Sequence, residues 1–226
     1  MALSASNLTF KSDTTNAVSY DTSSIQPSSS SLVLVSIHNR ISAGTAGTPT
    51  LTGNGLTYVL VNQTTGLNRA SHLFRALGVS PTSSLVTISF STQTQTEVTW
   101  VIDQITGTDT SGSNGSGAVV QSANGSTTDT SLTLFLNNFG SSNNFGYGCV
   151  EHGANNDTTP NAGFNELADV GNSEVGTRLA TIYLVNNTGV GASWSGSLFS
   201  QCIACEIKEE VSSSGFNLKP TMFQVF

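Results

Sequence analysis

Three histidines, His38, His72 and His152, are the first residues to test for chemistry, because imidazole is the usual general base near neutral pH. Nucleophilic catalysis by serine would require one of them beside a serine and an acid. With so many serines in the chain, chance proximity would prove nothing. The nearest approach to a Gly-x-Ser-x-Gly motif, GSNGSG at 112–117, lies in a Gly/Ser loop with no helix after it. The sequence therefore does not predict a serine hydrolase.

Acidic side chains are the second candidates, because two carboxylates on one face can hydrolyse a glycosidic bond. Glu97 and Asp103 are separated by an even number of residues in an expected strand, so their side chains share a face. Glu206 and Lys208 also share a face and could simply form an ion pair. A solvated strand edge explains all of these residues without catalysis. We therefore expect no enzymatic activity.

The cysteines, Cys149, Cys202 and Cys205, are odd in number, which argues against a disulfide framework. Cys202 and Cys205 have CxxC spacing, but SLFSQCIACEIK reads as a strand. Positions i and i+3 of a strand point to opposite faces, so these two thiols cannot grip one metal ion. No second CxxC or histidine pair completes a zinc site. We expect three buried apolar thiols, no metal and no cofactor.

Aromatic side chains could bind a sugar, because an exposed ring on a sandwich face offers a stacking platform. Trp194 is flanked by small residues in GASWSG and could present its ring, and Tyr58 and Tyr147 are further candidates. Packing in the hydrophobic core would also explain each of these three aromatic residues, and it is the favoured interpretation. A glycan contact through Trp194, Tyr58 or Tyr147 stays open at this point.

The elements that would position these residues are strands almost throughout. Apolar and polar residues alternate with period two in many short runs, and turn residues separate them every 8–12 residues or so. The denser run SLVLVSI at 31–37 suits a central strand covered on both faces. No amphipathic helix and no repeat at a fixed period is evident. The pattern predicts an all-β, antiparallel, jelly-roll-like β-sandwich over residues 1–210.

The C-terminal residues 211–226 differ from the rest. This stretch contains several large apolar side chains: Phe216, Leu218, Met222, Phe223, Val225 and Phe226. A solvated tail is rarely built this way. We expect it to form a further strand of its own sheet, or an extended arm that binds another subunit.

Composition limits the partners. Charged residues make up only 9% of the chain and the net charge is −7, so no basic patch exists for nucleic acid or an anionic membrane surface. Residues 1–10 have neither the basic start nor the apolar core of a secretion signal. The Ser-, Thr- and Asn-rich surface nevertheless resembles that of secreted and virion proteins. This combination favours a virion protein assembled in a host cytoplasm, with a mature secreted protein as the alternative.

Several segments carry a resemblance to a known group. SLVLVSIHN at 31–39 is followed by GTPTLTGNGLTYVLV, SHLFRAL, VTISFS and VTWVIDQITGTDTSG. Their order, within residues 30–208, resembles β-sandwich domains of tailed-bacteriophage virion proteins and of some bacterial surface proteins. The resemblance implies an assembly role, in particular a capsid decoration protein, often a trimer, that binds the major capsid protein or other virion proteins. The alternative is a glycan- or receptor-binding module of a phage tail or a bacterial surface protein.

Overall fold

The structure is a computed structural model and describes residues 2–153 and 156–210. Of these described residues, 0% are helical and 56% are in strands, and the sheets that they form are antiparallel. The prediction of an all-β, sandwich-like fold is therefore confirmed. The arm predicted at 211–226 lies outside the described residues.

The first half of the chain forms two sheets. A five-stranded sheet has the order β1-β8-β3-β6-β5, and a three-stranded sheet has the order β2-β7-β4. The strands are β1 (Ser4–Asp13), β2 (Ser19–Asp21), β3 (Leu32–Arg40), β4 (Thr50–Gly53), β5 (Val59–Thr65), β6 (Arg69–Leu77), β7 (Val86–Ser89) and β8 (Glu97–Thr106).

The second half repeats this arrangement. Its five-stranded sheet has the order β13-β14-β11-β16-β9, and its three-stranded sheet has the order β10-β15-β12. Adding eight to each strand number of the first half, so that β1 becomes β9, gives the strand orders of both sheets of the second half. The strands are β9 (Val119–Thr127), β10 (Ser131–Phe135), β11 (Phe145–His152), β12 (Thr159–Pro160), β13 (Asn165–Asn172), β14 (Thr177–Val185), β15 (Gly189–Ser193) and β16 (Ser200–Ile207).

Each half is a jelly roll. When the strands are counted within one half, the first, eighth, third and sixth lie in one sheet, and the second, seventh and fourth lie in the sheet that faces it. The fifth strand of each half joins the larger sheet beside the sixth. Bulges repeat as well: the β1/β8 and β5/β6 pairs each contain one, and so do the equivalent β9/β16 and β13/β14 pairs. Bulges are specific local features, so their recurrence supports a true structural repeat.

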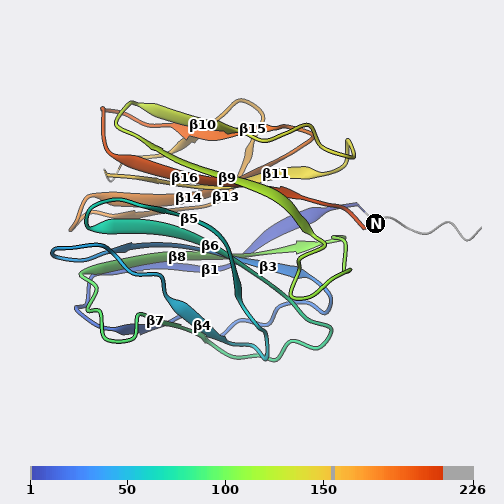
Figure 1. The fold of residues 1–226 in the computed structure, drawn as a ribbon, viewed down its shortest axis with the longest axis horizontal. Helices are drawn as coiled ribbons and strands as arrows, with labels where there is room; N and C mark the ends of the chain where they lie inside the picture. Colours follow the sequence, from blue (N-terminus) through green and yellow to red (C-terminus); the bar gives the residue numbers. More distant parts are fainter. Residues whose placement is uncertain (1, 154–155, 211–226) are drawn as a thin grey trace, which may run out of the picture.

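The four sheets stack as four layers, with the two five-stranded sheets in the middle (Figure 1). A central core fills the space between these two sheets, and a separate outer core lies under each three-stranded sheet. Both faces of each inner sheet are thus covered. The strands β3, β11 and β16 are consequently buried along nearly their whole length.

The two jelly rolls pack with pseudo-twofold symmetry. β1 contacts β13, and the equivalent pair β9 and β5 is also in contact. In the same way, β8 contacts β14 and β16 contacts β6. Every such contact recurs with the two jelly rolls exchanged, which is the property of a self-complementary dimer interface. The chain therefore resembles a dimer joined into one polypeptide.

Glycines in β11 let the outer layer approach closely. A side chain at Gly148 would collide with Val190 of β15, and one at Gly146 would collide with the carbonyl oxygen of Asn187. In FGYGCV, Phe145, Tyr147 and Cys149 thus face the central core, whereas Gly146 and Gly148 make room for β15 and only Val150 fills the outer core. This alternation follows from the period-two geometry of a strand.

Candidate functional site

The polar side chains that could do chemistry meet between the two central strands, β3 and β11. On the inward face of β3, Leu32 and Leu34 belong to the central core, and Ser36 and His38 follow toward one end. On the inward face of β11, Glu151 lies at that same end and contacts His38. The interface is therefore apolar at one end and polar at the other.

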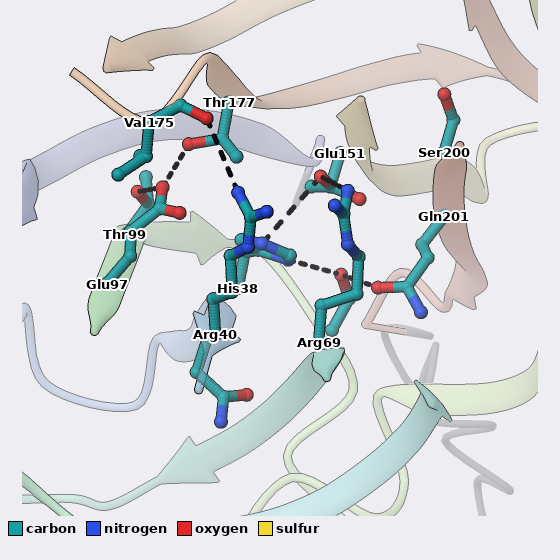
Figure 2. A network of polar contacts seen from close by, with 12 residues as sticks. His38, Arg40, Arg69, Glu97, Thr99, Glu151, Val175, Thr177, Ser200 and Gln201 are labelled. Carbon is teal, nitrogen blue, oxygen red and sulfur yellow. Dashed lines mark hydrogen bonds and ion pairs between the residues drawn. The ribbon is translucent and has the colours of Figure 1, made fainter. Parts of the chain in front are cut away.

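His38 is the centre of this polar cluster (Figure 2). Its Nδ1 lies 3.4 Å from the Ser71 hydroxyl, which donates a hydrogen bond to Oε1 of Gln201 at 2.9 Å. Its Nε2 lies 3.7 Å from Oε1 of Glu151. His38 is fully buried, and this burial holds its pKa well below the usual value. The imidazole is therefore neutral at pH 7.

Glu151 is the buried acid beside it. Burial raises the pKa of Glu151 to about 8, although Arg69 Nη1 lies 3.6 Å from its carboxyl group. The carboxyl group is thus mostly protonated at pH 7, which avoids the large cost of an unsolvated buried charge. Within the described part of the chain, neither carboxyl oxygen makes a hydrogen bond.

Glu97 lies close to the same end of the interface. It accepts hydrogen bonds from the hydroxyls of Thr177, in the second jelly roll, and Thr99, and burial raises its pKa. The Thr99 hydroxyl also lies 2.7 Å from that of Ser12, which accepts a hydrogen bond from Nδ2 of Asn172. These bonds tie β8 and β1 to the second jelly roll.

A second group of polar contacts surrounds Asp103. Tyr147 of the opposite sheet donates its hydroxyl to Asp103 at 2.8 Å, and Asn7 donates its amide at 2.8 Å. Burial raises the pKa of Asp103 to about 6. Glu97 and Asp103 do point to the same face, but a solvated edge is the wrong explanation, because both are fully buried.

The possible ion pair between Glu206 and Lys208 does not form. Glu206 accepts hydrogen bonds from Gln121 and Asn144. Lys208 instead pairs with Asp109 at 2.7 Å, which ties the end of β16 to the segment between the two jelly rolls.

The order Ser71, His38, Glu151 superficially resembles a nucleophile–base–acid series. Ser71 and His38 are 2% and 0% exposed, and Glu151 is 1% exposed. A substrate therefore has no access to them in this structure, and the serine hydroxyl is already committed to Gln201. What the cluster does in this arrangement is join the two jelly rolls through polar contacts.

The other two histidines lie apart from this cluster. His72 Nε2 lies 2.9 Å from Oδ1 of Asn39, and burial lowers its pKa to about 4. His152 stacks on Trp194 with ring centroids 5.2 Å apart, and its Nε2 lies 3.1 Å from the Thr158 hydroxyl. The structure therefore does not bring the three histidines into one site.

Two of the three proposed sugar contacts are contradicted by their burial. Tyr147 is 0% exposed and lies in the central core. Trp194 is 5% exposed, packs in an outer core and donates its indole N–H to the carbonyl oxygen of Asp129. A sugar cannot stack on either ring here. Tyr58 is half-buried and donates its hydroxyl to Asn54 at 3.2 Å.

The cysteines are placed as the strand pattern predicts. All three are free and buried. Cys202 packs in the outer core, whereas Cys205 packs in the central core on the other face of β16. The apolar residues predicted to form an interface, Phe216, Leu218, Met222, Phe223, Val225 and Phe226, lie outside the described residues.

Sequence reasoning missed Arg40, Arg69 and Glu151, which flank His38 (Figure 2). Polar residues within the apolar runs of β3 and β11 were the available signal. Within residues 2–153 and 156–210, no three His, Cys, Asp or Glu side chains are grouped to hold a metal ion. The same residues include no helix that is long and apolar enough to cross a membrane.

Comparisons with protein-family models, with curated proteins and with solved structures find no match to this chain.

Proposed function

We propose that this chain is a structural protein of a phage virion, most specifically a capsid decoration protein. Its partners would be the major capsid protein or other virion proteins, and it would assemble as a homo-oligomer, with a trimer favoured. It would act through its surface without catalysing a reaction, and without binding nucleic acid or a membrane. Assembly would take place in the host cytoplasm.

One observation carries this proposal. The side chains best suited to chemistry, among them His38, Glu97, Asp103 and Glu151, lie inside the interface between the two jelly rolls. There they hold one half of the molecule against the other, as a structural protein requires. A rigid block of four packed sheets suits a protein whose role is to support contacts.

The surface supports the same role. Only 9% of the residues are charged, and the exposed polar residues are mostly hydroxyl and amide side chains. Single large apolar side chains protrude from it: Phe10, Leu67, Val79, Val120 and Phe135 are each more than half exposed. Such anchors would contribute roughly 1–3 kcal/mol each when buried by a partner. Repetition on a lattice multiplies weak contacts into stable attachment.

The test is quantitative mass spectrometry of purified particles from cells that produce this chain. Hundreds of copies per particle are expected for a decoration protein. A few copies would indicate a tail component instead, and absence from particles would contradict a virion role altogether.

Removal of residues 211–226 tests the predicted arm separately. The truncated chain is expected to fold but to be lost from particles. Wild-type occupancy of the truncated chain would show that the arm does not attach it.

A further inference from the structure

Two arginines lie directly opposite each other at the end of β3 and the start of β6. Arg40 and Arg69 are cross-strand partners in the antiparallel register. They are two of only seven lysines and arginines in the chain. Like charges placed directly opposite each other in a sheet repel. This pairing therefore requires a compensating negative charge.

The chain itself provides only loose compensation. Arg40 Nη1 donates to the carbonyl oxygen of Val175 at 3.4 Å, and Arg69 Nη1 lies 3.6 Å from Glu151 without hydrogen bonding to any described residue. Arg178 shows what a satisfied arginine looks like in this protein. It holds Asp169 at 2.6 Å and Asp157 at 2.9 Å.

Neither of the two acids behind these arginines hydrogen bonds to them. Glu97, the cross-strand neighbour of Arg40, accepts its hydrogen bonds from threonine hydroxyls. Glu151 is buried, and its raised pKa keeps it mostly protonated at pH 7. His38, between the two arginines, is neutral. Positive charge is therefore left over at this end of the molecule.

Two cavities lie beside these arginines, and the Arg69 Nη1 atom itself is buried. One, of about 380 Å³, is lined by Arg40, Thr96 and Val175 among others, and the second, of about 260 Å³, by Arg69 and Phe199. Asn68 lines both cavities, which therefore lie next to each other.

The rim of the second cavity is apolar. Leu67 lines it and is 92% exposed, so its side chain is available to a ligand. The Phe199 ring lies 5.2 Å from the Arg69 guanidinium carbon and holds that side chain in place. A ligand with an apolar group beside its anion would contact both features.

We propose that Arg40, Asn68 and Arg69 bind an oxyanion, a phosphate or a carboxylate, on a ligand whose apolar part packs on Leu67 and Phe199. Guanidinium groups suit this role because their planar donors match the oxygens of either anion. The site does not depend on the virion role proposed above. A protein with any other function could use it equally.

Isothermal titration calorimetry with three probes tests the site at constant ionic strength: inorganic phosphate, phenyl phosphate and benzoate. Phenyl phosphate is expected to bind about tenfold or more tightly than phosphate, because its ring is buried against Leu67 and Phe199. Comparison with benzoate decides whether the site prefers a phosphate or a carboxylate.

Matched variants locate the binding. Arg40→Gln and Arg69→Gln should each weaken phenyl phosphate by at least tenfold. Lys11→Gln removes an equal charge from an exposed site and should have little effect. Leu67→Ser should remove the advantage of phenyl phosphate and leave inorganic phosphate unchanged.

Amide chemical shifts provide a readout that needs no variant. Phenyl phosphate should shift the amide signals of residues 66–69 in the unaltered protein, even if an arginine variant fails to fold. The absence of saturable binding by all three probes would overturn the proposal. So would saturable binding that leaves those amide signals unchanged or survives both arginine substitutions.

Discussion

His38 and Glu151 occupy equivalent positions in the two jelly rolls, and they contact each other. The bulge in the β5/β6 pair matches the bulge in the β13/β14 pair, which makes Leu73 of β6 equivalent to Thr181 of β14. Their cross-strand partners, Ser36 of β3 and Cys149 of β11, are therefore equivalent as well. Two residues further on lie His38 and Glu151, with Nε2 and Oε1 3.7 Å apart. The pseudo-twofold axis therefore passes close to this pair. In an exactly symmetric dimer, a residue at this position would contact its own copy. Here the two equivalent positions carry a base, His38, and an acid, Glu151.

The burial of Glu151 predicts an unusual loss of stability as pH rises. The unfolded carboxyl group titrates near pH 4.3, roughly the value of a free glutamate, whereas the folded one titrates near 8. Between these values the folded protein keeps a proton that the unfolded chain has released, so the free energy of unfolding falls as pH rises. The slope for one proton is at most about 1.4 kcal/mol per pH unit.

Glu151→Gln should remove this slope. Urea unfolding between pH 7.5 and 8 is the appropriate measurement, because unfolded histidines, with an ordinary pKa of 6.5, are then mostly neutral and Asp103 titrates near 6. Glu210→Gln, at an exposed position, should keep the slope of the unaltered protein. Equal slopes in the Glu151 variant and the unaltered protein would contradict the neutral buried acid.

Tyr147→Phe tests the polar contact in the central core. The substitution keeps the ring but removes the hydroxyl that donates to Asp103 at 2.8 Å. Since a buried acceptor loses a partner, unfolding should become easier by about 1–3 kcal/mol. The pKa of Asp103 should also rise above about 6, because that hydrogen bond lowers it. Carbon NMR of the carboxyl group measures this second effect.

Tyr183→Phe is the matched control. Tyr183 packs its ring on Phe145 at 5.0 Å between centroids and is only partly buried, so the loss of its hydroxyl should cost little. If both variants lost the same stability, the Asp103 contact would have no special role.

The alternating pattern was sufficient to predict strands, and the dense run at 31–37 correctly indicated a central strand, which is β3 from residue 32 onward. It was not sufficient to predict which polar residues are buried. In a sandwich of two sheets, the polar face of each strand contacts solvent. Here the inner sheets are covered on both faces, so Glu97 and Asp103 are buried although their spacing is that of an exposed edge.

The repeat was invisible for a different reason. Equivalent strands do not recur at a constant spacing: β3 begins at 32 and β11 at 145, whereas β8 begins at 97 and β16 at 200. The loops differ in length between the halves, and surface loops tolerate such changes at small cost. Strand order and bulge position are properties of the backbone, so only the structure reveals them.

The three thiols should be unreactive in the folded protein. Each is buried, and burial raises the pKa of Cys149 to about 11 and those of Cys202 and Cys205 further. Because the thiolate is the reactive form, titration with an aromatic disulfide reagent at pH 8 should detect no thiol before unfolding and three after it. Rapid reaction of Cys202 and Cys205 together in the folded protein would instead indicate an accessible CxxC pair.

Both tryptophans should be protected from solvent, which distinguishes core packing from a sugar platform. Trp100 is 1% exposed and Trp194 5% exposed, and the chain has no other tryptophan. Acrylamide should therefore quench the fluorescence of the folded protein only weakly, and unfolding in urea should increase quenching several-fold. Trp194→Ala should also destabilise the fold by about 3–5 kcal/mol, because it empties part of an outer core. If half of the emission were readily quenched while the protein remained folded, the Trp194 ring would be accessible and a glycan contact at that residue would again be a valid hypothesis.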